Sequence, residues 1–225
     1  MLATIITEEQ WLKLKSILLD LNVYDKPSLK ETFLGIIYRL KTGCQWRYLP
    51  SCYGKANTVF KAFRRWSASG LFYRLFKRLI KDADMEWVSI DATHVRAHQS
   101  SAGSAGDDYQ YIAKSVGGNS SKIHLAVDAH GNPIEFIVSD GVTHDIKIAP
   151  MLLQLLDLQD TEFLNADKGY DSEEFRSLAY SQGVRANIPR KKNAKSNNSH
   201  MDWLIYQARH VVENTFANLK HFRAL

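Results

Sequence analysis

The sequence has few of the features that mark membrane, secreted or disordered proteins. No apolar run approaches the roughly 18 residues that a membrane-spanning helix needs. The start, MLATIITEEQWLKLK, places acidic side chains after a very short apolar patch, which is not the pattern of a signal peptide. Only 5 prolines accompany 45% apolar residues, which predicts one large packed domain or two smaller ones. We therefore expect a cytoplasmic protein with no membrane partner.

Cysteine is equally scarce. The chain has two, Cys44 and Cys52, eight residues apart in a segment typical of a loop. Their spacing matches no common zinc site. A disulfide stays open as an alternative, but a cytoplasmic chain favours reduced thiols. We assign the two cysteines no functional role.

Acidic residues are scarce in the first third of the chain only. Residues 1–80 contain 14 Lys and Arg against 5 Asp and Glu, a net charge of +9, whereas residues 81–225 contain 15 against 19, a net charge of −4. This asymmetry favours a first part that binds a polyanion and a second part that gathers carboxylates around metal ions. Basic helices that are merely soluble would give the same composition.

Residues 1–82 have helical periodicity. Capping-box patterns at Thr7 and Ser28 begin two helices, and Gly43 is placed to end the second. The stretches KANTVFKAFRRWSASG and LFYRLFKRLIKD predict two more helices, both amphipathic and basic. We interpret 1–82 as a helical DNA-binding unit of helix-turn-helix type; the alternative is a purely structural bundle, which fits almost as well. Three cations of the third helix are candidate DNA contacts: Lys61, Arg64 and Arg65.

The pattern changes over residues 83–225. EWVSIDATHV alternates between apolar and polar residues and predicts a strand with Asp91 near its middle, and SKIHLAVDAHGNPIEFIVSDG predicts a hairpin. We then expect a helix capped by Asp145, a short strand ending at Asp167, a helix capped by Asp171, and a further short strand. This order predicts an α/β domain whose mixed sheet is antiparallel in one half and parallel in the other.

The last segment, YQARHVVENTFANLK, predicts one amphipathic helix. At about 100° per residue, four polar side chains fall within roughly 60° of one another: Tyr206, Arg209, Glu213 and Lys220. Beside them runs an apolar stripe that can pack on a core: Ile205, Ala208, Val212, Phe216 and Leu219. The simplest interpretation is a solvated face with an Arg209–Glu213 pair, worth a few tenths of a kcal/mol.

Three carboxylates fit a metal-assisted phosphoryl transfer. That chemistry uses anionic oxygens on rigid elements to hold two Mg²⁺ ions about 4 Å apart. Asp91, Asp167 and Glu213 meet the description, and repulsion among them should perturb their pKa values. Structural alternatives are a pairing of Asp91 with His94 and a capping of the Gly169 turn by Asp167.

Other candidate ligands are weaker. Turns or helix caps account for four further aspartates: Asp128, Asp140, Asp145 and Asp171. A histidine-based metal hydrolase would draw on side chains that lack tight ligand spacing: His94, His98, His124 and His144.

Several stretches together resemble an insertion-sequence DDE transposase of the insertion-sequence-five type. They are TGCQWRYLPSCYG, SIDATHVRAH, SSKIHLAVDAHGNPIEFIVSDGVTHD, NADKGYDS and the Y-R-E-K signature Tyr206-x₂-Arg209-x₃-Glu213-x₆-Lys220. The resemblance covers nearly the whole chain and implies a ribonuclease-H-like catalytic domain over 83–225. It implies that Asp91, Asp167 and Glu213 are catalytic and bind two Mg²⁺ ions, for which Mn²⁺ substitutes. It also implies that three residues handle DNA near the scissile phosphate: Tyr206, Arg209 and Lys220.

The activity implied by the resemblance is cutting of insertion-sequence ends and transfer of their 3′ hydroxyls to target DNA. The expected partner is double-stranded DNA, both terminal repeats and target, bound by a homodimer on paired ends at a prokaryotic nucleoid. Members of the family usually continue for some tens of residues past this helix, whereas this chain stops at Leu225. The short C-terminus leaves open a truncated, catalytically inactive copy that acts as a DNA-binding protein or repressor. A separate alternative is a nuclease of the same fold without strand transfer.

Overall fold

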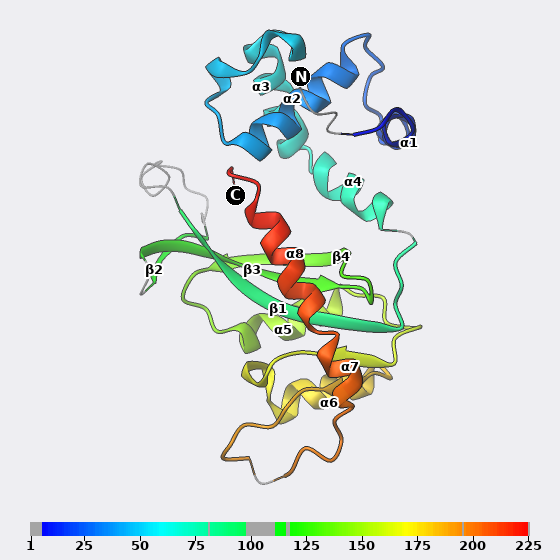
Figure 1. Ribbon diagram of the computed structural model, residues 1–225, viewed down its shortest axis with the longest axis vertical. Helices are drawn as coiled ribbons and strands as arrows, with labels where there is room; N and C mark the ends of the chain where they lie inside the picture. The colour runs from blue at the N-terminus through cyan, green and yellow to red at the C-terminus, as the bar shows by residue number, and fades with distance from the viewer. Residues whose placement is uncertain (1–5, 81, 98–110, 116–117, 195, 225) are drawn as a thin grey trace. The chain divides into compact units, whose positions relative to one another are not determined.

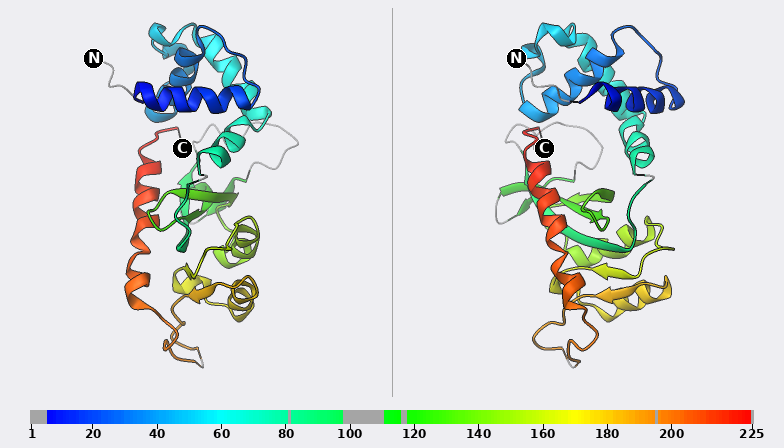
Figure 2. Two further views of the ribbon diagram at one scale, coloured as in Figure 1. Left: turned by 90° about the vertical axis from the view of Figure 1, so that its right-hand side faces the viewer. Right: turned by 45° about the vertical axis from the view of Figure 1, so that its right-hand side comes forward.

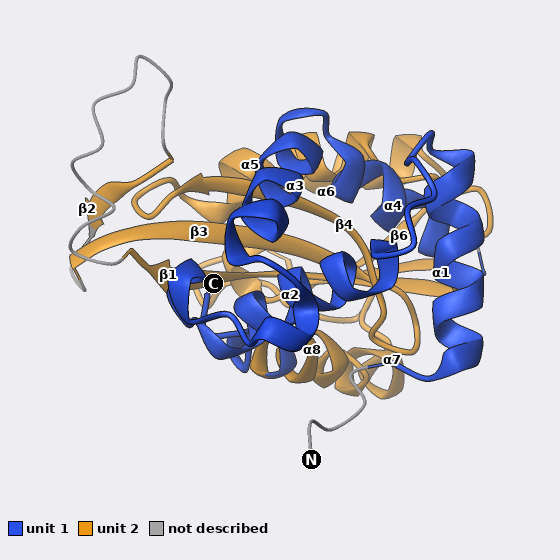
Figure 3. Cartoon of the chain, turned by 90° about the horizontal axis from the view of Figure 1, so that it is seen from above, with its two compact units in different colours: residues 1–82, 218–225 blue, residues 83–217 orange. Residues whose placement is uncertain are grey.

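The computed structural model describes residues 6–80, 82–97, 111–115, 118–194 and 196–224. Figure 3 shows its two compact units, residues 1–82 with 218–225 and residues 83–217. The expected loop at 99–108 and the candidate His98 lie outside the described residues. Within the described part, no helix combines the length and apolar character that crossing a bilayer requires. Cys44 and Cys52 are both free thiols.

The first unit is built of helices, as its periodicity predicts. They are α1 (Glu8–Asp20), α2 (Leu29–Thr42), η1 (Trp46–Tyr48), η2 (Ser51–Tyr53), α3 (Ala56–Ala68) and α4 (Leu71–Leu79). Their apolar faces enclose one core, with Leu18 and Ile36 fully buried and Trp11, Phe33 and Trp66 stacked in tilted ring contacts. Burial of this apolar surface is the main force that holds the helices together.

The ends of the first two helices test local capping rules. Thr7 forms the predicted capping box, since its hydroxyl accepts from Gln10 N at 3.1 Å and the Gln10 side chain accepts from Thr7 N at 2.8 Å. Gly43 ends α2 in the left-handed conformation, at φ +69°. The capping box at Ser28 is wrong: its side chain makes no cap bond, and its carbonyl instead accepts from the Thr32 hydroxyl.

The second unit contains a six-stranded mixed sheet. Its strands are β1 (Trp87–Arg96), β2 (Ala113–Ser115), β3 (Gly118–Val127), β4 (Pro133–Asp140), β5 (Phe163–Asn165) and β6 (Arg185–Asn187). They pair in the order β4-β3-β1-β5-β6, and β2 also pairs with β3. β1 is antiparallel to β3 and parallel to β5, and β5 is parallel to β6. This antiparallel meander with two added parallel strands is the ribonuclease-H-like arrangement that was expected.

Helices cover both faces of this sheet. The turned view in Figure 2 places α5 (Asp145–Gln154) and α6 (Glu173–Ser181) on one face and α7 (Trp203–Gln207) and α8 (His210–Lys220) on the other. Figure 1 shows α8 crossing the strands β1 and β3. Leu152, Leu153 and Phe175 are buried on the first face, and Val212 and Phe216 on the second. The α7–α8 face thereby brings the last segment of the unit over the strand that carries Asp91.

Two predicted helix caps are wrong by one residue. α5 starts at Asp145 with His144 as its cap, and α6 has Ser172 as its cap, one residue after Asp171. Each carboxylate has a distant cationic partner instead: Asp145 pairs with Lys122 at 2.9 Å, and Asp171 binds arginines described below. Ion pairs with side chains from other elements replaced the local backbone bonds that capping would use.

The single helix predicted over the last segment is also corrected. It is divided at Ala208–Arg209 into α7 and α8. Around the division, backbone amides bond to the carbonyl three residues earlier, as in Arg209 N to Tyr206 O and Val212 N to Arg209 O. This tighter winding changes the angle between Tyr206 and Glu213 from that of one regular helix.

Candidate active site

Asp91 lies in the middle of β1, the strand between β3 and β5. It pairs in register with Leu125 of β3. One carboxylate oxygen accepts the Ala92 backbone N–H at 2.8 Å, and the side chain is 22% exposed. The other oxygen faces the α7–α8 segment. A carboxylate in this place is held by a paired strand and still reaches the surface on one side.

Asp167 follows β5 by two residues. Because β5 runs parallel to β1, with Ser89 opposite Asn165, Asp91 and Asp167 each lie two residues beyond this last pair in the same direction. The Asp167 carboxylate accepts the Gly169 N–H at 2.7 Å and caps the short helix η4 (Lys168–Tyr170). The capping alternative is therefore realised, and it fixes this side chain at the strand end.

Arg209 links the two other candidates. Its Nη1 lies 3.3 Å from an Asp91 oxygen, and its Nη2 lies 2.5 Å from a Glu213 oxygen. The guanidinium also lies over the ring of Tyr206, 5.9 Å from the centroid. Sequence spacing predicts the pair with Glu213, whereas the pair with Asp91 joins residues 118 positions apart. One cation thus bridges a strand carboxylate and a helix carboxylate.

The electrostatics show that these carboxylates influence one another. Burial raises the pKa of Asp91, and Asp167 and Glu213 add to the rise. The Ala92 N–H and the Arg209 guanidinium act in the opposite direction but do not outweigh burial. The pKa of Asp91 is thus perturbed as expected, but burial is the main cause and repulsion by the other carboxylates is secondary. Glu213 is 56% exposed, so water solvates much of its charge.

Tyr170 is a buried residue at the end of η4, the short helix that Asp167 caps. Its side chain is only 2% exposed, and burial raises the pKa of its phenol, with further rises from Asp145, Asp91 and Asp167. The phenol therefore stays neutral beside three carboxylates. It packs its ring against Phe175 of α6, which connects the Asp167 turn to the core.

The donor chemistry suits hard divalent cations, which prefer carboxylate oxygens. Asp91 and Glu213 would hold such an ion between their carboxylates, where the Arg209 guanidinium lies in this structure. Asp167 would supply the third carboxylate. Among the described residues, no three Asp, Glu, His or Cys side chains converge closely enough to hold a metal ion. The three-carboxylate metal site therefore stays a prediction, and here the guanidinium neutralises two of its members.

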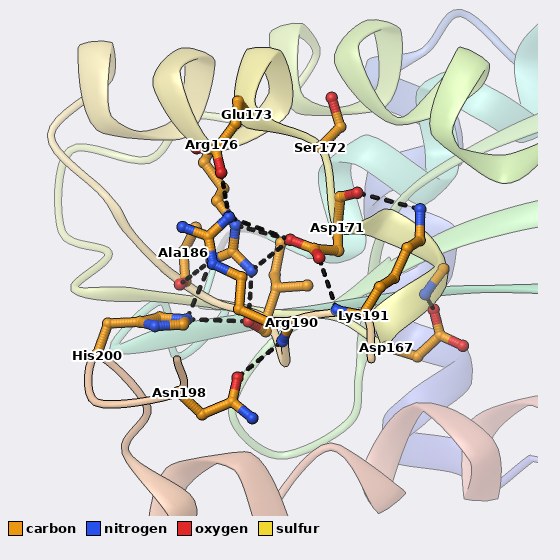
Figure 4. A network of polar contacts seen from close by, with 12 residues as sticks. Asp167, Asp171, Ser172, Glu173, Arg176, Ala186, Arg190, Lys191, Asn198 and His200 are labelled. Atoms are coloured by element: carbon orange, nitrogen blue, oxygen red, sulfur yellow. Dashed lines mark hydrogen bonds and ion pairs between the residues drawn. The ribbon is translucent and has the colours of Figure 1, made fainter. Parts of the chain in front are cut away.

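A buried ionic network centred on Asp171 fixes the end of the turn that begins at Asp167 (Figure 4). Asp171 is 6% exposed and accepts from Arg176 Nε at 3.0 Å and Nη2 at 2.8 Å, from Arg190 at 3.4 Å, and from Lys191 N at 2.8 Å. Arg176 also donates to the carbonyl of Ile188 at 2.6 Å. The network fastens the segment after β6 to the turn that follows β5. Sequence reasoning missed it because nothing local marks these pairings.

A second polar link ties β5 and β6 to the start of α7. Asn187 is 1% exposed and donates to the Asn165 side chain at 2.8 Å and to the Asp202 carbonyl at 2.9 Å. The side-chain amide oxygen of Asn187 accepts from Asp202 N at 3.0 Å. The Asp202 carboxylate then caps α7 through the amides of Leu204 and Ile205. The helix that carries Tyr206 is therefore anchored to the strand that precedes Asp167.

The remaining predicted residues are placed as follows. Lys220 is exposed in the last turn of α8. Three cations are exposed on α3, away from its buried Val59, Ala62 and Trp66: Lys61, Arg64 and Arg65. In unit 2, buried His124 bonds to the Ser139 hydroxyl at 2.8 Å, and burial lowers its pKa to about 4. No histidine cluster for a metal exists among the described residues.

Both parts of the sequence match known protein families. A family described as putative transposase of the IS4/5 family matches residues 6–76, and a transposase DDE domain family matches residues 82–225. An uncharacterised protein, y4sN, of Sinorhizobium fredii is 36% identical over 31% of this chain and 55% of its own length. The putative transposase for insertion sequence element IS402 of Burkholderia cepacia is 31% identical over 47% of this chain and 51% of its own length.

The chain thus spans about half the length of these two relatives. Among solved structures, a piggyBac transposase synaptic complex with hairpin DNA aligns with 77% of this chain and 44% of its own, with a TM-score of 0.49 and 10% identity. That similarity is too low to support an argument about function. The family match, in contrast, covers more than half of the chain and includes all three candidate carboxylates. The chain belongs to the transposase DDE domain family.

Proposed function

We propose that this chain is a DNA transposase that cuts insertion-sequence ends and transfers their 3′ hydroxyls to target DNA. The observation that carries the proposal is the bridge from Asp91 through Arg209 to Glu213, inside a segment that matches the transposase DDE domain family. The strand carboxylate Asp91 and the helix carboxylate Glu213 both pair with Arg209, whose guanidinium is a side chain that commonly binds phosphate. Asp167, at the end of the neighbouring parallel strand, supplies the third carboxylate.

In the proposed reaction, water attacks the phosphorus at the element's end and the bond to the 3′ oxygen breaks. The freed 3′ hydroxyl then attacks a phosphodiester of the target, so one bond forms for each that breaks. Asp91, Asp167 and Glu213 would hold two Mg²⁺ or Mn²⁺ ions, which activate the attacking oxygen and stabilise the leaving oxygen. Asp91 is oriented for this by its bond to Ala92 N, and Asp167 by its bond to Gly169 N.

Arg209 and Tyr206 are proposed to receive the DNA end. The planar guanidinium binds two oxygens at once, and phosphate oxygens can replace the carboxylates that it now bridges. Tyr206 lies beside it on α7, where it can stack or donate a hydrogen bond near the scissile phosphate. Lys220, in the last turn of α8, would add a point charge along the backbone.

The helical unit is proposed to bind the terminal repeats through the exposed cations of α3. Lys61, Arg64 and Arg65 extend from a helix whose other side is buried, which suits contact with a phosphate backbone. We propose that a homodimer acts on paired ends and that the reaction takes place on a prokaryotic nucleoid.

The test is a cleavage and joining assay. The substrate is duplex DNA carrying both boundaries of the genomic element that encodes the chain, incubated with Mg²⁺ or Mn²⁺. We expect nicks at the boundaries and joined products, and no cleavage after substitution of Asp91, Asp167 or Glu213 by alanine, with end binding largely retained. Wild-type cleavage by any one of these variants would refute the assignment. Nicks without joined strands would indicate a nuclease.

A second candidate is a DNA-binding protein without catalysis. The observation that favours it is the neutralisation of Asp91 and Glu213 by Arg209, together with the lack, among the described residues, of a converged metal-ligand group. Binding of end DNA without metal-dependent nicking would support this candidate.

A further inference from the structure

We propose that Thr215 is a positioning residue that fixes Glu213 relative to Asp91 by fastening α8 to the β3–β4 turn. The inference rests on the proposed function for the meaning of that geometry. The Thr215 hydroxyl lies 2.6 Å from the Gly131 carbonyl oxygen, a contact between residues 84 positions apart. It also lies 3.0 Å from the Val211 carbonyl of its own helix.

The turn that receives Thr215 is rigid. Asp128 is fully buried, and its carboxylate accepts from His130 N at 3.0 Å, from Asn132 N at 2.8 Å and from Asn132 Nδ2 at 3.0 Å. Asp84 N donates to the same carboxylate at 3.3 Å. A carboxylate with four donors holds a turn in one shape, because each bond removes a degree of freedom from the backbone.

Gly131 lets the helix approach the turn. Its φ is +84°, which L side chains rarely adopt, and a Cβ added there would lie 3.1 Å from the Val211 Cβ. Glycine therefore serves two needs at once, the turn conformation and the close approach of α8. The contact fixes the height of the helix above the hairpin.

These contacts form a continuous path between two of the candidate catalytic carboxylates. Asp91 lies in β1, and Leu125 of β3 is its partner in register. β3 leads into the Asp128 turn, the turn contacts Thr215, and Thr215 lies two residues after Glu213. The neighbouring apolar contacts of Val212 and Phe216 hold the helix on the sheet, but hydrophobic packing is not directional. The hydrogen bond of the Thr215 hydroxyl is directional, so it sets the rotation of α8 about its axis and its height above the hairpin.

The test replaces Thr215 in the full chain with valine, which keeps the shape and removes the hydroxyl, and with serine, which keeps the hydroxyl. Thr32→Val is the matched control, because it removes a hydroxyl bond to a backbone carbonyl, Ser28 O at 2.7 Å, in the other unit. Two quantities are measured: hydrogen exchange of the α8 amides without metal, and Mn²⁺ affinity by electron paramagnetic resonance.

We expect the amides of residues 211–216 to exchange about fivefold faster in Thr215→Val, the effect of one typical hydrogen bond. Mn²⁺ should bind several times more weakly, with Thr215→Ser and Thr32→Val like wild type in both measurements. Gly131→Ala should reproduce the valine phenotype through the turn side of the contact.

Unchanged α8 exchange in Thr215→Val, or failure of serine to rescue, would overturn the positioning role. The same holds if exchange rises but Mn²⁺ affinity equals that of wild type. A wild-type chain that binds no Mn²⁺ would instead overturn both the proposed metal site and the meaning of this contact for it, while the exchange data would still report whether the contact holds α8.

Discussion

The Asp171 network gives the most quantitative prediction about stability. In Asp171→Asn, the side chain keeps its shape but loses its charge and places an amide N–H₂ among donors from Arg176, Arg190 and Lys191. Hydrogen bonds to charged groups contribute about 1.5–3 kcal/mol each, and removing one partner of a buried pair costs about 3–5 kcal/mol. Arg176 retains its bond to Ile188 O and Arg190 retains Glu173, so we expect the lower end, about 3 kcal/mol.

The effect should depend on pH in one direction. Burial acts to raise the pKa of Asp171, but the Lys191 amide and the two arginines outweigh it and lower the pKa below its ordinary value of 3.8. A lowered pKa means that the stabilisation is present above pH 3.8 and is lost as the pH falls through the folded-state pKa. The difference between wild type and Asp171→Asn should therefore close in strong acid.

The assay is urea denaturation followed by circular dichroism and tryptophan fluorescence, at pH 7 and at several values below pH 4. Glu162→Gln is the control, because Glu162 pairs with Arg185 with both side chains more than half exposed. Exposed pairs contribute only about 0–1 kcal/mol, so the control should barely change stability. The reasoning fails if Asp171→Asn costs no more than Glu162→Gln at neutral pH, or if its cost persists unchanged in acid.

Three further predictions concern the two units. Asn187→Ala should lower the free energy of unfolding, measured by urea denaturation, by about 1–3 kcal/mol, because it leaves buried hydrogen-bond partners unsatisfied. The control Asn197→Ala, at an exposed position, should leave it unchanged, and equal effects of the two substitutions would contradict the link to α7. Asp91→Asn should raise the melting temperature at pH 7, because the raised pKa of Asp91 means that its negative charge destabilises the folded state. The gain in melting temperature should shrink as the pH falls toward 3.8, and a lower melting temperature at pH 7 would contradict this reasoning. Replacing the three α3 cations Lys61, Arg64 and Arg65 with alanine should weaken DNA binding. The slope of log binding constant against log salt concentration should become shallower by about 0.9 for each lost phosphate contact, and an unchanged slope would exclude this surface as a DNA contact.

Local patterns predicted the elements of this fold well. The alternation around Asp91 is a strand, the run through Gly131 is a hairpin, and Thr7 and Gly43 mark helix ends as expected. These features depend on neighbouring residues, so a single sequence contains the necessary information. The antiparallel half and the parallel half of the sheet follow from the same patterns, whereas the short strand β2 was not predicted.

Features set by distant residues could not be predicted. Asp145 and Asp171 are in place to cap helices, but Lys122 and Arg176 bind their carboxylates instead. The division of the last helix also lacks a local signal, because neither Ala208 nor the residue after it disfavours a helix. Spacing gave the Arg209–Glu213 pair, while the contact of Arg209 with Asp91 required the tertiary structure.

The central claim is that Asp91, Asp167 and Glu213 bind divalent metal ions for phosphoryl transfer. The most direct measurement is anomalous diffraction at the manganese edge from crystals of the full chain grown with DNA ends and Mn²⁺. We predict manganese peaks in contact with all three carboxylates, and the Arg209 guanidinium moved from its bridge between Asp91 and Glu213 to the DNA phosphate. An unchanged Arg209 bridge, with no manganese at Asp91, would contradict the account.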